Sequence, residues 1–221
     1  QLVGQETAIN NSNNAISMLQ TAEGAFDEMT NIVYRMKELA TQAANGTNSG
    51  DEYKAFDGEY QALKSELTNI LGNTSFGSGT KLLDATTGKF AAAVEFQIGA
   101  SKDEVLKVDI SGSLTAIKVG DLKDLTTQVL SKAEIDSLDT FLKNVGAARS
   151  ALGANMNRLD HTINNLGNMT ENTGAAKSQL MDADFAKEAS NMTKQQLLLN
   201  SGISVLSTAN STTQMVSQLL R

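Results

Sequence analysis

The feature that most constrains this chain is a repeat of apolar side chains at alternating steps of three and four residues. Between residues 135 and 166 the repeat is interrupted once, at Arg149. This spacing keeps the side chains on one edge of a helix and predicts a long seam against other helices. The apolar positions of this C-terminal seam are Ile135, Leu138, Leu142, Val145, Leu152, Met156, Leu159, Ile163 and Leu166.

Two similar stripes occur nearer the N-terminus, and three stripes predict three helices that share one narrow core. The break at residues 45–50 contains Asn, Gly, Thr and Ser, and so short a connection predicts that the first two helices are antiparallel neighbours. We expect these helices over residues 5–44 and 51–71, and a third after residue 131. As seam residues we single out Phe26, Val33, Leu63, Leu142, Leu152 and Leu159.

Between residues 74 and 120 the apolar period changes from helical to alternating. Val94, Phe96 and Ile98 alternate with polar residues, and a second such run covers residues 105–110. This pattern predicts a β-hairpin. A lone hairpin is marginally stable, so we expect it to pack against the helices. The predicted fold is mainly α with a small β part: an elongated antiparallel helical bundle, coiled-coil-like, with a β-hairpin region.

We divide the chain into four segments. Residues 1–74 form the N-terminal rod helices, 75–131 the β-hairpin and turn region, 132–175 the C-terminal rod helix, and 176–221 a final helix. Ser131 followed by Glu134 predicts a capping box that opens the third helix. Asp182 and Asp184 are expected near a helix start, where carboxylates meet free backbone donors.

The composition argues against several function classes. Cysteine is absent and His161 is the single histidine, so the sequence offers neither a thiolate nor a histidine cluster for catalysis, a metal or a cofactor. The net charge of -7 and the scattered basic residues argue against a nucleic-acid partner. No apolar run reaches the roughly 20 residues that span a bilayer, so no membrane partner is expected. We therefore expect no enzyme.

The final helical segment lacks a partner within the chain. Apolar residues from Phe185 to Leu220 lie on more than one face of a helix, which is costly in water. Something outside this chain, or a missing part of it, should cover them.

Motifs at both ends resemble those of bacterial flagellin, the subunit of the flagellar filament. They cover residues 20–25, 35–45, 76–83, 148–154, 157–159, 164–166, 181–188 and 219–221, which leaves mainly residues 85–131 without a match. Relatives usually begin with a further helix upstream of Gln1, so we interpret the chain as truncated at its N-terminus. Relatives also often carry Val-Pro-Gln-Asn where this chain has residues 211–214.

The resemblance implies a structural subunit that polymerises with other flagellin subunits into an extracellular bacterial filament used for motility. It also implies that a flagellar export chaperone holds the C-terminal helix before assembly. The residues expected to contact this chaperone, or the inner tube of the filament, are Leu199, Ile203, Leu206, Val216 and Leu219.

A vertebrate innate immune receptor recognises many flagellins through the first helix and its neighbour. The matching positions here are Arg35, Leu39, Gln42 and Glu59, for which subunit contact in the filament is the alternative. Tyr34 and Leu63 depart from the family pattern, which weakens this expectation. Two other functions remain open: the junction protein between hook and filament, and a coiled-coil adhesin or scaffold.

The seam itself is testable. Leu142→Asp or Leu152→Asp would each place an unpaired charge on the seam. We expect loss of helical circular dichroism and a lower melting temperature for both variants. An unchanged melting temperature would contradict the assigned seam.

Overall fold

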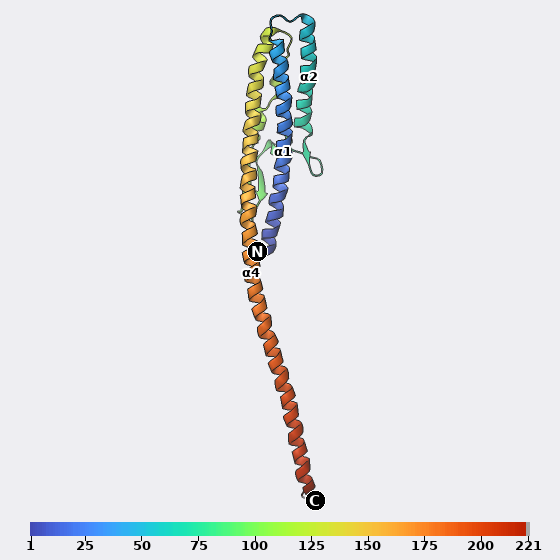
Figure 1. Cartoon of the computed structure of the whole chain (residues 1–221), viewed down its shortest axis with the longest axis vertical. Coiled ribbons are helices and arrows are strands. Elements are labelled where there is room, and N and C mark those ends of the chain that lie inside the picture. The colour runs from blue at the N-terminus through green and yellow to red at the C-terminus, as the bar shows by residue number, and fades with distance from the viewer. Residues whose placement is uncertain (220–221) are drawn as a thin grey trace. The chain divides into compact units, whose positions relative to one another are not determined.

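The structure is a computed structural model that describes residues 1–219, with only the backbone described at residues 182–184, 218 and 219. The chain divides into two units, one covering Gln1–Met169 and the other beginning at Thr170. Three long helices account for most of the chain: α1 (Leu2–Ala43), α2 (Gly50–Asn73) and α4 (Gln128–Leu219) (Figure 1). The expected mainly α fold is confirmed.

The turn between α1 and α2 is closed by local hydrogen bonds. Ser49 is the N-cap of α2: its Oγ accepts a hydrogen bond from the Glu52 backbone N–H, and its own N–H donates to the Glu52 carboxylate at 2.6 Å. This capping box satisfies two backbone donors at the start of α2. The two helices are thereby joined as antiparallel neighbours, as the short connection predicted.

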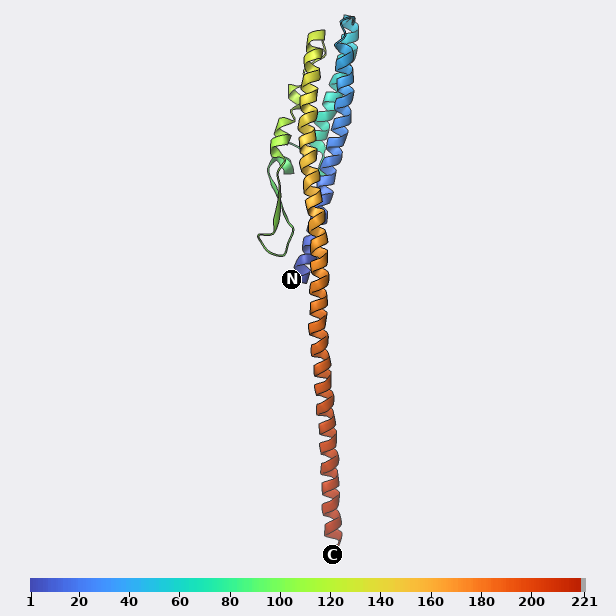
Figure 2. The same ribbon diagram turned by 60° about the vertical axis from the view of Figure 1, so that its left-hand side comes forward.

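In the first unit, α1, α2 and the first part of α4 lie side by side (Figures 1 and 2). Their apolar stripes form one core with a seven-residue spacing on both α1 and α4. The fully buried members on α1 include Leu19, Ala22, Phe26, Met29, Val33, Met36 and Ala40, and those on α4 include Leu138, Val145, Ala148, Leu152 and Leu159.

The predicted hairpin is present as β3 (Val94–Gln97) and β4 (Val105–Val108), paired antiparallel with Val94 opposite Val108. A smaller antiparallel pair, β1 (Ser75–Phe76) and β2 (Thr80–Lys81), turns through glycines 77 and 79, whose positive φ angles favour residues without a Cβ. The short helices η1 (Lys89–Ala91), α3 (Ser111–Ala116) and η2 (Val119–Asp121) complete this region. Its buried side chains Leu106, Val108 and Leu114 join the helical core.

Two expected helix starts are wrong. The third long helix begins at Gln128, so Ser131 lies inside it and its hydroxyl donates to the Thr127 carbonyl at 2.8 Å. Asp182 and Asp184 likewise fall inside α4 rather than at its start. The physical reason is that residues 175–201 contain neither Gly nor Pro, so nothing in the sequence interrupts the helix there.

Instead of capping a helix, Glu134 is fully buried among the helices of the first unit. One carboxylate oxygen accepts a hydrogen bond from the Tyr60 hydroxyl of α2 at 2.5 Å, and the other accepts from the Lys123 backbone N–H at 2.8 Å. Glu134 therefore connects α2, α4 and the segment before α4. It was missed as a core residue because a charged side chain does not extend an apolar pattern.

Further polar contacts fasten the same segment to α2. Asp57 accepts a hydrogen bond from the Leu125 backbone N–H at 2.8 Å, and Lys64 donates to the Leu122 carbonyl at 2.7 Å. Buried backbone groups without partners are costly, so these side chains replace the hydrogen bonds that an irregular segment lacks.

Burial raises the pKa of Glu134, and the hydrogen bonds from Tyr60 and Lys123, together with the charges of Lys64 and Lys123, only partly oppose this shift. Burial is also the main cause that raises the pKa of Tyr60 above its usual range, so the tyrosine stays protonated. A carboxylate with a raised pKa stabilises the fold most in its protonated state.

Stability should therefore depend on pH through Glu134. Its contribution is fully present below the ordinary value of 4.5 and is lost as the pH rises through the raised pKa of the folded state. Glu134→Gln keeps the shape and removes the titration. We expect the wild-type melting temperature to fall relative to that of Glu134→Gln between pH 4 and pH 7, measured by circular dichroism.

The control for this measurement is Glu6→Gln, at an exposed position of α1. Its melting temperature should follow the wild-type profile. Parallel profiles for Glu134→Gln and the wild type would contradict the assigned titration.

Candidate functional site

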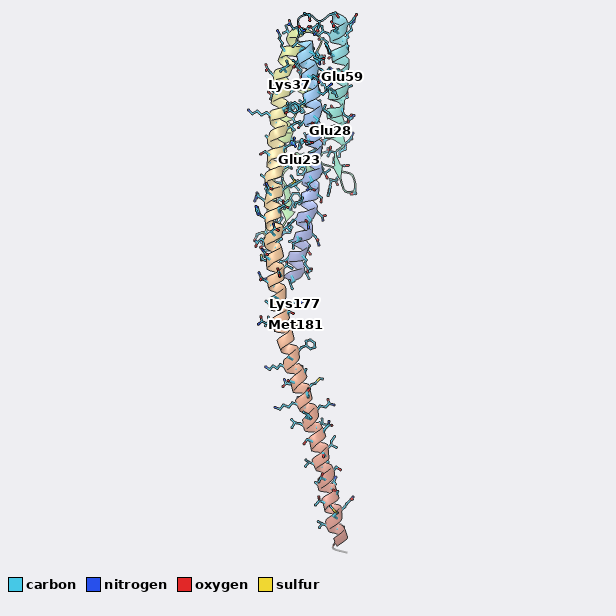
Figure 3. All side chains as sticks on the ribbon, in the orientation of Figure 1. Glu23, Glu28, Lys37, Glu59, Lys177 and Met181 are labelled. Atoms are coloured by element: carbon cyan, nitrogen blue, oxygen red, sulfur yellow. The ribbon has the colours of Figure 1, made fainter. Side chains whose placement is uncertain are left out.

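The second unit exposes its apolar side chains. Every described side chain in residues 175–181 and 185–217 is exposed, and Figure 3 shows them projecting around a single helix. Soluble proteins rarely expose large contiguous apolar patches unless these bind something. The large exposed apolar residues here are Leu180, Met181, Phe185, Met192, Leu197, Leu198, Leu199, Ile203, Val205, Leu206, Met215 and Val216.

These apolar residues occupy well over half of the helix circumference. At 3.6 residues per turn, Met192, Leu199, Ile203 and Leu206 share one face, while Leu198 and Val205 lie on an adjacent one. A stripe for a single partner helix would be narrower. The remaining narrow face carries small polar residues, namely Thr193, Asn200, Ser204, Ser207 and Ser211.

The residues predicted for chaperone or inner-tube contact lie on this surface. Leu199, Ile203, Leu206 and Val216 are between 51% and 67% exposed, so none is used by the fold itself. Leu219 belongs to α4, but its side chain lies outside the described residues. The structure thus leaves the four described residues available to a partner.

The four residues predicted for receptor contact do not form one exposed group. Arg35 and Glu59 are exposed and paired: the Arg35 Nε donates to the Glu59 carboxylate at 2.8 Å, joining α1 to α2. Gln42 is exposed as well and donates to Glu38, which also accepts from Arg35. Leu39, in contrast, is 2% exposed and belongs to the core.

The hydrogen bonds of Arg35 with Glu38 and then Glu59 raise the pKa of its guanidinium, which therefore stays charged. Exposed pairs of this kind contribute little to stability. Their main effect is to hold a defined pattern of charge on the surface of α1 and α2.

The six predicted seam residues all lie on the inner side of the first unit. Phe26, Val33, Leu152 and Leu159 are fully buried. Leu63 and Leu142 are partly buried and pack against the same core. The Asp substitution at Leu142 should accordingly be milder than that at Leu152.

The interruption of the seam at Arg149 has a specific cause that the sequence pattern alone did not reveal. The Arg149 guanidinium contacts two acids of α1, with Nε 2.8 Å from the Glu23 carboxylate and Nη2 3.0 Å from the Asp27 carboxylate. Arg149 thus replaces an apolar contact between α1 and α4 with a charged one. A search for acids four residues apart on the facing helix would have found these partners.

Among the described residues, no group of three or more His, Cys, Asp or Glu side chains is arranged to hold a metal ion. In the same part of the chain, no helix has the length and apolar content needed to cross a membrane.

Comparison with known proteins identifies the family. The sequence model of the bacterial flagellin N-terminal helical region matches residues 1–87, and that of the bacterial flagellin C-terminal helical region matches residues 135–220. The chain belongs to the bacterial flagellin family. Both matched regions include the helices whose seams form the first unit, and the second also includes the exposed helix.

Individual flagellins match along the whole chain. Flagellin of Halalkalibacterium halodurans is 41% identical over 100% of this chain and 80% of its own length, and that of Bacillus subtilis is 36% identical over 100% and 82%. The crystal structure of Bacillus cereus flagellin has a TM-score of 0.61 and 33% identity, covering 76% of this chain and 94% of that one.

A flagellar hook-associated protein from Vibrio parahaemolyticus shares the fold with a TM-score of 0.62, but at 13% identity this likeness extends to the fold alone. The flagellin assignment is therefore favoured over the junction protein and over an adhesin or scaffold. As a flagellin, the chain is a structural component of the flagellar filament, exported from the cell and polymerised with other flagellin subunits, and it is not an enzyme.

Proposed function

We propose that this flagellin assembles into the extracellular filament through the exposed apolar faces of residues 180–181 and 185–217. The observation that carries the proposal is the row of large apolar side chains, each more than half exposed, from Leu180 to Val216. Burying one Leu or Ile side chain contributes roughly 1.5–3 kcal/mol. Covering this row supplies a large driving force for association.

The width of the apolar surface favours more than one neighbour for each helix. A helix that is apolar on most sides is stable only when enclosed. Contacts between different surfaces of identical subunits need not close into a ring, and those that do not close generate helical filaments. A subunit with a packed first unit and an uncovered second unit suits this mode of assembly.

The proposal is tested by charging the apolar face. In the full-length protein, expressed in a motile bacterium lacking its own flagellin, Leu199→Glu with Ile203→Glu should reduce filament number and length at least tenfold by electron microscopy. The reason is that two carboxylates would have to be buried at the subunit contacts.

The matched control is Asn200→Glu with Ser204→Glu, which adds the same charges at the same spacing on the polar face. We expect this variant to retain more filaments than the apolar-face variant. Normal filaments from Leu199→Glu with Ile203→Glu would overturn the proposal.

We propose further that an export chaperone covers the same helix before assembly. An amphipathic helix commonly binds by laying its apolar face into a groove of its partner. Leu199, Ile203, Leu206 and Val216 are the described anchors offered for such a groove. Occupation of the same face by chaperone and subunits would make the two contacts mutually exclusive.

For recognition by a vertebrate innate immune receptor, we propose the exposed cluster formed by Arg35, Glu59 and Gln42. Leu39 supports this surface from within the core and does not contact the partner directly. The support is the defined charge pattern held by the Arg35–Glu59 pair.

This surface can be tested in a cell reporter assay with nanomolar protein. Arg35→Ala with Glu59→Ala should lower the response several-fold, because charged groups at an interface set orientation and association rate. Lys54→Ala, which removes an exposed charge elsewhere on α2, is the control. Absence of any response to the wild-type chain would remove the proposal.

A further inference from the structure

The apolar seam between α1 and α4 does not by itself define a single alignment. Buried residues recur every seven positions on α1, at 15, 22, 29, 36 and 43, and on α4, at 138, 145, 152, 159 and 166. A seam with this repeat keeps apolar residues opposite apolar residues after a slip of one heptad. Such a slip would displace α1 along α4 by about 10 Å, since a helix rises about 1.5 Å per residue.

Two charged contacts across this seam fit the same antiparallel alignment of α1 and α4. Arg149 of α4 contacts Asp27, and Asp139 of α4 contacts Lys37. Ten residues forward along α1, from Asp27 to Lys37, therefore correspond to ten residues backward along α4, from Arg149 to Asp139. Both Glu23 and Lys37 are labelled on α1 in Figure 3.

The two contacts have opposite polarity. At the first, α1 carries the acids, Glu23 and Asp27, and α4 carries the base; at the second, α1 carries the base and α4 the acid. The side chains of Glu23, Arg149 and Lys37 are about one third exposed or less, whereas those of Asp27 and Asp139 are more than half exposed. Water therefore screens the Glu23–Arg149 pair less than the other two pairs.

Slips of one heptad in either direction destroy both contacts. In one direction Lys37 faces Lys132 and Arg149 faces Gln20. In the other, Lys37 faces Gly146 and Arg149 faces Tyr34. Neither slipped alignment pairs opposite charges at these positions, and the first brings two like charges together.

We infer that Glu23, Asp27 and Lys37 of α1, together with Asp139 and Arg149 of α4, form a charge code that selects one alignment of the two helices. Charged or polar groups on an otherwise apolar helical seam are well attested as devices that fix register. Selecting one alignment of α1 and α4 is a role separate from the proposed assembly through the second unit. A single alignment matters for a filament because every subunit must place its contact surfaces at the same position along the helix axis.

The alignment can be measured with spin labels, because the native chain contains no cysteine. Asn31→Cys and Asn165→Cys place nitroxides on exposed positions of α1 and α4. In the aligned state residue 31 faces residue 145, which puts the labels about 30 Å apart along the helix axis. Pulsed electron paramagnetic resonance should give one distance for the otherwise unchanged chain.

Reversing the charges on α4 alone, with Asp139→Lys and Arg149→Asp, places like charges at both contacts. The slip that moves Lys37 opposite Gly146 relieves this repulsion. We expect a second population, shifted to an axial separation of about 20 Å. Adding Glu23→Lys, Asp27→Lys and Lys37→Asp on α1 restores complementarity and should restore the single longer distance.

A single unshifted distance in the α4-reversed variant would overturn the inference. The alignment of α1 and α4 would then be set by the shapes of the apolar residues and by the contacts of α2. Should that variant lose its helical signal, the neutral pair Asp139→Asn with Arg149→Gln takes its place. It should show the shorter distance as a minor population, and a single native distance would again overturn the inference. Reversal of the exposed Lys54–Asp51 pair is the control and should leave the distance unchanged.

Discussion

The antiparallel seam between α1 and α4 is the interaction on which the first unit depends. It joins segments separated by more than a hundred residues of sequence, as the contact between Lys37 and Asp139 shows. The intervening elements, α2 and the small β region, pack onto the core that this seam starts. Each layer of so thin a bundle contains few apolar side chains. Removing any one of them therefore weakens the packing of both helices.

The irregular segment before α4 shows a second principle, in which polar side chains replace missing secondary structure. Residues 122–125 lie between α2 and α4, and Asp57, Lys64 and Glu134 bond their backbone groups. Burying a carboxylate carries a cost in desolvation, which the two hydrogen bonds of Glu134 offset only in part. These hydrogen bonds give the segment between the β region and α4 a fixed shape.

Helical periodicity predicted the three long helices, and alternation predicted the hairpin, because both signals repeat over several residues. The partners of Arg149 and the burial of Glu134 were not predicted, since each depends on a neighbour that only the folded chain supplies. The same limit applies to Leu39, whose place in the core makes it unavailable for contact. For the second unit, the sequence identified apolar residues on more than one face of the helix, and the structure adds that the described large ones are each more than half exposed.

The threonine side chains of the exposed helix have one further consequence. Thr193, Thr208, Thr212 and Thr213 donate their hydroxyl protons to carbonyls one turn earlier in the same helix. From Gln195 to Leu220 the chain contains no Asp, Glu, Lys or Arg. These hydroxyl groups therefore need neither water nor a neighbour to satisfy them, and no ionised group resists dehydration. Neighbouring subunits can surround this stretch on every side, including its polar face, without burying an unpaired charge.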